Sequence, residues 1–242
     1  MSLVSATRFV GGLREYAYRG FQQLPLVIGS TSLLFTIATG SVAHGNLAIG
    51  MGVLMPAYTL ILQMVFGWLM TKIWKDSIFW KRSSGDLCRI IPDHTKTSSL
   101  EYYTSNALDG SVPSFWLTSM AFFIGFCISN AIDSLNTPMT PGSNEINYEK
   151  RNTHATIVII TTFIFAFLII VARFYFMVGC EGAGTGGILL SILSAVGASL
   201  IGYTMYFVSK RCGARSSDLF GILSQILPPS ATSPKPVVCT AE

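Results

Sequence analysis

Charged residues are scarce in this chain: Asp, Glu, Lys and Arg make up 12% of its 242 residues, whereas soluble domains carry about 25%. Half of the residues are hydrophobic, and the mean hydropathy is +0.53. This shortage of charge argues against a soluble domain and favours a protein whose solvent is lipid. The 16 basic residues are dispersed and form no patch of the kind that binds nucleic acid, so we predict no nucleic-acid partner.

The signatures of common catalytic and metal sites are also missing. No G-x-S-x-G or H-E-x-x-H motif occurs, and the three histidines are isolated. The glycine-rich stretch 179–187 lacks the Lys-Ser/Thr of a phosphate loop, so we interpret it as a turn. Neither a zinc site nor a disulfide framework is predicted from the five cysteines, which are widely spaced: Cys88, Cys127, Cys180, Cys212 and Cys239. We therefore predict no enzymatic activity and no cofactor.

Long hydrophobic runs are what the chain does contain. The run 155–178 has no charge before Arg173, and as a helix it covers about 35 Å, enough to cross a hydrocarbon core of about 30 Å. We expect it to be the run around which the others are organised. The sequence predicts an all-α polytopic transmembrane protein with about five spans, four being the alternative, at 24–43, 47–70, 113–132, 155–178 and 185–209.

Polar and amphipathic segments divide the chain further. We predict an amphipathic N-terminal segment over 1–23, a transmembrane hairpin over 24–70 and a polar loop over 71–112. A three-span bundle over 113–209, an amphipathic juxtamembrane helix over 210–227 and a Pro/Ser/Thr-rich tail over 228–242 complete the chain. Within the hairpin, the polar residues 44–46 are the predicted turn, and Pro56 predicts a kink in the second span.

Three small residues at a spacing of four, Ser194, Ala198 and Gly202, form a stripe on the fifth span. Small residues let two helix backbones approach closely in lipid, so we predict that this stripe packs against another helix. Arg173 and Glu181 are ionisable groups near membrane depth, where charge is usually paired. They are a candidate ion pair, the alternative being an arginine that reaches the headgroups and an exposed glutamate.

The loop 71–112 is a candidate docking surface for a protein. It has six basic and five acidic residues with aromatic residues among them, and aromatic anchors in a polar surface are typical of protein interfaces. Trp80, Tyr102 and Tyr103 are the candidate contacts in this loop, and Phe220 is the candidate contact in the juxtamembrane helix. Ten of the 16 Lys and Arg residues lie on the N-terminal side of a five-span arrangement, which predicts a cytoplasmic N-terminus and a C-terminus on the opposite side.

Several stretches resemble multi-pass proteins of large icosahedral DNA viruses of algae and protists: PSFW at 113–116, residues 122–131, GCE at 179–181, CGAR at 212–215 and DLFGI at 218–222. The resemblance covers roughly residues 113–227. It implies a virion protein in the internal membrane beneath the capsid, a minor capsid component that contacts capsid or other virion proteins, and it brings no catalytic residues. If the protein is a capsid component, we expect both loop 71–112 and tail 210–242 to contact capsid proteins. The alternative is a small channel or transporter subunit of an organelle or viral membrane. Homo- and hetero-oligomers are both compatible with the sequence.

Overall fold

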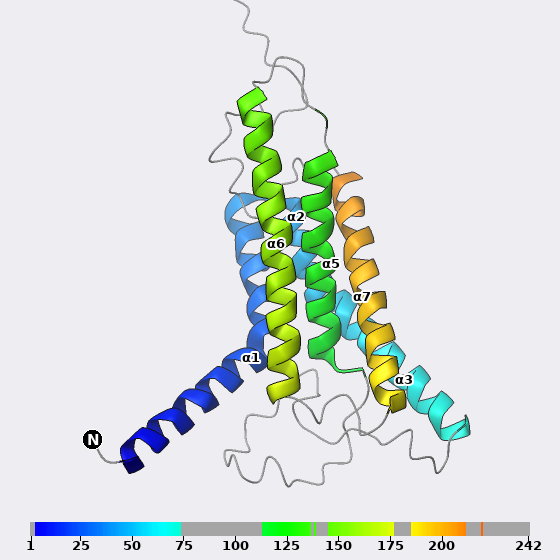
Figure 1. Cartoon of the computed structure of the whole chain (residues 1–242). Coiled ribbons are helices and arrows are strands. Elements are labelled where there is room, and N and C mark those ends of the chain that lie inside the picture. The colour runs from blue at the N-terminus through cyan, green and yellow to red at the C-terminus, as the bar shows by residue number, and fades with distance from the viewer. Residues whose placement is uncertain are drawn as a thin grey trace, which may run out of the picture.

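The computed structural model describes residues 3–73, 113–136, 138, 145–176, 185–211 and 219. It describes the backbone alone for residues 3–15, 17–19, 22, 70, 71, 73, 146, 147, 173–176, 185, 186 and 209. These residues form α-helices and one π-helical turn, η1, with no strand among them (Figure 1). The all-α prediction is confirmed. In chain order the elements are α1 (Leu3–Thr39), α2 (Val42–Ile49), η1 (Gly50–Leu54), α3 (Met55–Ile73), α5 (Phe115–Asn136), α6 (Glu145–Phe176) and α7 (Thr185–Arg211).

Four helical stretches are long and apolar enough to cross a membrane: Val42–Leu69, Phe115–Asn136, Tyr148–Ala172 and Gly187–Val208. The polytopic character is therefore confirmed. The first predicted span, 24–43, is shorter than expected, because its apolar helical part is Gln23–Thr39. At 1.5 Å per residue this part covers about 25 Å, slightly less than a typical hydrocarbon core.

The turn of the hairpin lies at Gly40 and Ser41, so the predicted turn at 44–46 is wrong. Gly40 has a φ of 67°, a left-handed conformation that glycine adopts without strain, and its N–H donates to the carbonyl of Thr36 at 2.8 Å. This is how a glycine commonly ends a helix. Residues 44–46 belong to α2, where the side chain of His44 hydrogen-bonds to that of Ser41 at 2.9 Å.

The second span contains a π-helical turn, η1, shortly before Pro56, and the kink predicted at Pro56 itself stays a prediction. η1 directly precedes α3, and the N–H of Met55 donates to the carbonyl of Gly50 across this wider turn. In an α-helix, two residues four positions apart are offset by about 40° around the helix axis, so a stripe at this spacing gradually rotates around the helix. We infer that the wider turn reduces this rotation, because one buried stripe continues through all three elements at Ala43, Leu47, Met51, Met55 and Thr59.

α5 is the central helix of the bundle. In its most apolar stretch 67% is buried, against 17% for α6, and α5 contacts α1, α3, α6, α7 and η1. The expectation that the run 155–178 organises the bundle is therefore wrong. α6 is the most apolar span because most of it faces outward, whereas α5 carries small and hydroxylated residues that allow neighbouring helices to approach.

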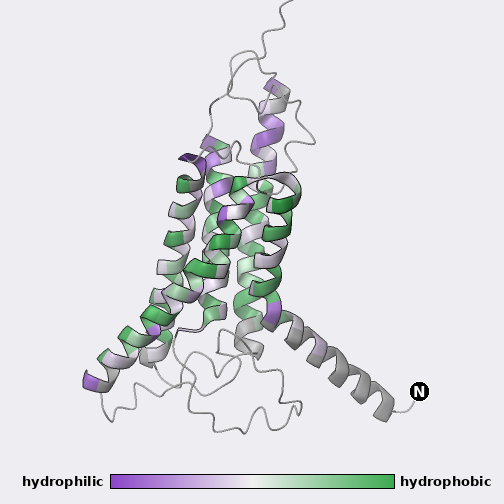
Figure 2. Ribbon diagram, turned by 180° about the vertical axis from the view of Figure 1, so that it is seen from behind, coloured by the Kyte–Doolittle hydropathy of each residue, from purple (hydrophilic) through white to green (hydrophobic). Residues whose placement is uncertain are grey.

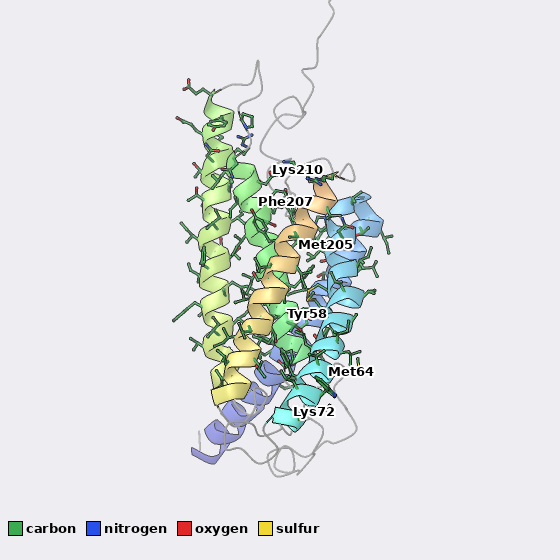
Figure 3. The ribbon with its side chains drawn as sticks, turned by 90° about the vertical axis from the view of Figure 1, so that its right-hand side faces the viewer. Tyr58, Met64, Lys72, Met205, Phe207 and Lys210 are labelled. Carbon is green, nitrogen blue, oxygen red and sulfur yellow. The ribbon has the colours of Figure 1, made fainter. Side chains whose placement is uncertain are left out.

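Side-chain contacts define the direction of each helix relative to α5. Ser199 and Lys210 of α7 lie beside Gly125 and Asp133 of α5, so these two helices are parallel. α3 and α6 run in the opposite direction, since Thr59 and Gln63 meet Thr118 and Pro113, and Phe165 meets Phe123 while Ile169 packs beside Trp116. Figure 3 shows Lys72 of α3 and Lys210 of α7 at opposite ends of the bundle.

The bundle therefore has two ends with different chain segments. At the N-terminal face α3 and α6 end and α5 and α7 begin; at the C-terminal face α5 and α7 end and α6 begins (Figure 1). α6 projects beyond its neighbours at the C-terminal face, where its first turns are hydrophilic (Figure 2). Both helix ends that segment 74–112 connects lie at the N-terminal face, and the tail after Arg211 leaves from the C-terminal face.

Candidate functional site

The parallel pair of α5 and α7 forms the most extensive contact between helices in the described part of the chain. A Cβ atom built on Gly202 lies 2.2 Å from the carbonyl oxygen of Phe122, and one built on Gly125 lies 2.1 Å from the carbonyl oxygen of Ser199. Each glycine therefore touches the backbone of the opposite helix. In lipid, where apolar burial no longer drives association, such close packing holds helices together.

The sequence-derived stripe lies in the interior of the bundle. Ser194 is 2% exposed and Ala198 is fully buried, and Gly202 contacts α5 as described above. Gly125, the reciprocal glycine on α5, was missed by the sequence analysis. Its signal is a second spacing of four, because Ala121, Gly125 and Ser129 follow one another on α5.

A tyrosine joins α3 to the same stretch of α7. The Tyr58 hydroxyl donates to the carbonyl of Ser194 at 3.1 Å, and a Cβ on Gly197 would lie 2.4 Å from this hydroxyl oxygen. Gly197 thus leaves the space that the phenol occupies. In Figure 3 Tyr58 lies between the ribbons of α3 and α7.

Two further polar contacts join α3 to α5. The hydroxyls of Thr59 and Thr118 are 2.7 Å apart and completely buried. One turn further along α3, Gln63 Nε2 donates to the carbonyl of Pro113 at 2.7 Å. The Ser114 hydroxyl accepts a hydrogen bond from the backbone N–H of Leu117 and so acts as the N-cap of α5. Because the Leu117 N–H is used in this way, the carbonyl of Pro113, four residues before Leu117, is available to Gln63.

An ion pair connects the ends of α5 and α7 at the C-terminal face. Lys210 Nζ lies 2.7 Å from Asp133 Oδ1, and the Tyr206 hydroxyl donates to Asp133 Oδ2 at 3.1 Å. The Asp133 side chain is 11% exposed and the Lys210 side chain 51%. This pair was not predicted, because residues 77 positions apart become neighbours only once the relative shift of two parallel helices is known.

The predicted ion pair lies outside the described residues. Arg173 is in α6 but its side chain is not described, and Glu181 lies between α6 and α7. The candidate partner contacts Trp80, Tyr102, Tyr103 and Phe220 also lie outside the described residues. The juxtamembrane segment 210–227 is described at three positions, of which Leu219 is 3% exposed and joins the main hydrophobic core.

Trp68 and Lys72 of α3 form a cation–π pair near the N-terminal face of the bundle. Trp68 is 60% exposed, and Lys72 Nζ lies 4.7 Å from the centre of its ring. Tryptophan and lysine at a helix end are typical of a membrane interface. Among the residues described, no three His, Cys, Asp or Glu side chains are grouped to hold a metal ion.

Comparisons with known proteins give no relative: no protein-family model, no curated protein and no solved structure matches the chain. The described contacts therefore have to be interpreted from their own chemistry. They consist of close helix crossings, hydroxyl and carbonyl hydrogen bonds and one ion pair at a helix end.

Proposed function

We propose that this chain is a structural, non-enzymatic membrane protein of a virion, a minor capsid component that anchors the internal membrane to the capsid shell. The observation that supports this most directly is the crossing of α5 and α7, where Gly125 and Gly202 touch the backbone of the opposite helix. A bundle whose central helices are in backbone contact is suited to holding a fixed shape. The resemblance of residues 113–227 to virion membrane proteins supports the same function.

The direction of the helices limits which segments can reach the shell. Segment 74–112 connects helix ends at the N-terminal face, and the tail leaves from the C-terminal face. With a bilayer around the bundle, only one of them is on the shell side. The expectation that both loop 71–112 and tail 210–242 contact the shell is therefore revised. We assign the shell to loop 71–112, which has the candidate anchors Trp80, Tyr102 and Tyr103, and the interior of the particle to the tail with Phe220.

Purified virions provide the test. Replacement of Trp80, Tyr102 and Tyr103 by alanine is expected to release shell proteins from the membrane fraction while leaving the amount of this protein in the membrane unchanged. Phe220→Ala is the matched aromatic control, because the tail is assigned to the other side of the membrane, and it should retain the shell. Absence of the protein from purified virions, or full shell attachment in the triple variant, would contradict the proposal.

One observation favours the alternative, a small channel or transporter subunit. The second span is interrupted by η1 and Pro56, and interrupted spans often line the sites of transporters. On this alternative the decisive residues are Asn130, Asp133, Arg173 and Glu181. Ion flux through purified protein in vesicles, abolished in Asp133→Asn, would favour the channel; vesicles that stay tight would favour the anchor.

A further inference from the structure

Pro25 interrupts the hydrogen bonding of α1 at one defined carbonyl. Proline has no N–H, so the carbonyl four residues earlier, that of Phe21, loses its helical donor. An unpaired carbonyl near the hydrocarbon region is costly, and helices with proline in membranes need another donor for it.

Trp116, in the first turn of α5, supplies that donor. Its Nε1–H donates to the carbonyl of Phe21 at 2.7 Å, and the two rings are 4.4 Å apart. Trp116 is 3% exposed and packs with Met120 and with Ile169 of α6. The indole is thus held by the bundle, and through it the bundle holds one backbone atom of α1.

α1 changes direction close to this contact. Figure 1 shows the part of α1 before Pro25 diverging from the bundle and the part after it running along the bundle. Tyr16, on the diverging part, is 79% exposed, whereas Pro25 is buried. The Phe21–Trp116 hydrogen bond therefore lies at the bend between the two parts.

We propose that Pro25 and Trp116 form a hinge with a fixed angle: the proline makes α1 bendable at Phe21, and the indole N–H fixes the bend by donating to the carbonyl for which the proline supplies no N–H. Trp116 is a positioning residue for the N-terminal part of α1. This proposal does not depend on the virion function, since it concerns two neighbouring elements of the bundle.

The test is a double-mutant cycle on the full-length protein in detergent or lipid vesicles, with amide hydrogen exchange of residues 16–24 as the readout. Trp116→Phe keeps an aromatic ring but removes the N–H, and it should raise exchange in this stretch by roughly fivefold, about the loss of one hydrogen bond. In the Pro25→Ala background residue 25 again has an N–H for the Phe21 carbonyl. Trp116→Phe should then change exchange by less than about twofold.

The same set of variants also gives an answer if Trp116→Phe prevents folding. If Trp116→Phe alone fails to give a monodisperse protein, the double variant should recover it, because alanine at 25 restores the missing hydrogen bond. Equal effects of Trp116→Phe in both backgrounds, or failure of both variants to fold, would show that the packing of the indole matters and its N–H does not. Either result would overturn the hinge. As a matched control, Phe163→Ala on the outward face of α6 should leave exchange at residues 16–24 unchanged.

Discussion

At the scale of single residues, two glycines determine how closely α5 and α7 approach. Gly125 and Gly202 lie on opposite helices and each contacts the backbone of the other helix. Backbone atoms cannot move aside as a flexible side chain can, so the space at these positions is fixed. Gly67, by contrast, has room, because a Cβ there meets nothing within 4 Å.

Gly202→Ala is expected to destabilise the bundle, because its Cβ would lie 2.2 Å from the Phe122 carbonyl oxygen. Overpacking of this kind costs about 1–3 kcal/mol, which thermal unfolding in detergent detects. Gly67→Ala is the matched control and should be neutral or slightly stabilising, since alanine favours a helix by about 1 kcal/mol over glycine. Equal unfolding temperatures for the two variants would mean that α5 and α7 do not cross in this way.

The Asp133 carboxylate forms an ion pair with Lys210 and accepts a hydrogen bond from Tyr206, and two substitutions distinguish these roles. Asp133→Asn removes the charge but keeps an oxygen for the Tyr206 hydroxyl, and because Lys210 is half exposed the loss should stay below about 1 kcal/mol. Asp133→Ala also removes the acceptor of Tyr206, which is 3% exposed, and should cost about 1–3 kcal/mol. Denaturant unfolding distinguishes the two, and a larger loss for asparagine than for alanine would refute this division.

Among the helices, α5 is the buried centre of the bundle, whereas most of α6 faces outward. Phe122 and Phe126 of α5 are completely buried, whereas Phe163 and Phe167 of α6 are 60% and 66% exposed. An exposed apolar side chain in a membrane faces lipid tails, which are as apolar as the side chain itself. The two helices therefore differ in what a truncation removes.

Phe126→Ala should destabilise the protein by about 3–5 kcal/mol, the usual cost of removing a buried aromatic ring. Phe167→Ala should cost less than about 1 kcal/mol, because lipid tails fill the space that the ring leaves and no partner helix loses a contact. Reversible unfolding in mixed micelles measures both. If Phe167→Ala proved the more damaging variant, α6 would be the organising helix after all.

The existence of the helices could be predicted from hydrophobic runs alone, and most of their ends agree with the structure to within a few residues. The exceptions are the hairpin turn, the start of α6 and the start of α1, which begins at Leu3 and joins the predicted segment 1–23 and the first span in one helix. The turn was misplaced because His44, Gly45 and Asn46 are polar and small, while the residue that ends α1 is Gly40 in a left-handed conformation. α6 starts at Glu145 because the polar residues before the hydrophobic run continue the same helix beyond the membrane.

The contacts between helices were largely beyond the reach of the sequence. The stripe at Ser194, Ala198 and Gly202 has a visible spacing, but its partner on α5 depends on how far two parallel helices are shifted. The Asp133–Lys210 pair depends on the same shift. Which helix is most buried was misjudged because hydrophobicity in a membrane protein reports contact with lipid as well as burial.

At the scale of the whole molecule, the opposite directions of α3 and α7 separate the two polar parts of the chain. The helix ends joined by segment 74–112 are at one face and the end of α7 is at the other. With a bilayer around the bundle, these helix ends lie on opposite sides of the membrane. The proposed contact of loop 71–112 with a shell requires this separation, because the tail then lies on the other side of the membrane.

Two native cysteines allow the most direct measurement of this separation. Cys88 lies within segment 74–112 and Cys239 lies in the tail. Each variant retains one of these two cysteines and no other. In sealed membrane vesicles of uniform orientation, the reaction of that cysteine with a membrane-impermeant maleimide reports which side of the membrane it is on. We predict that one cysteine reacts in intact vesicles and that the other reacts only after the membrane is permeabilised. Reaction of both in intact vesicles, or of neither until permeabilisation, would place loop and tail on the same side and contradict the account.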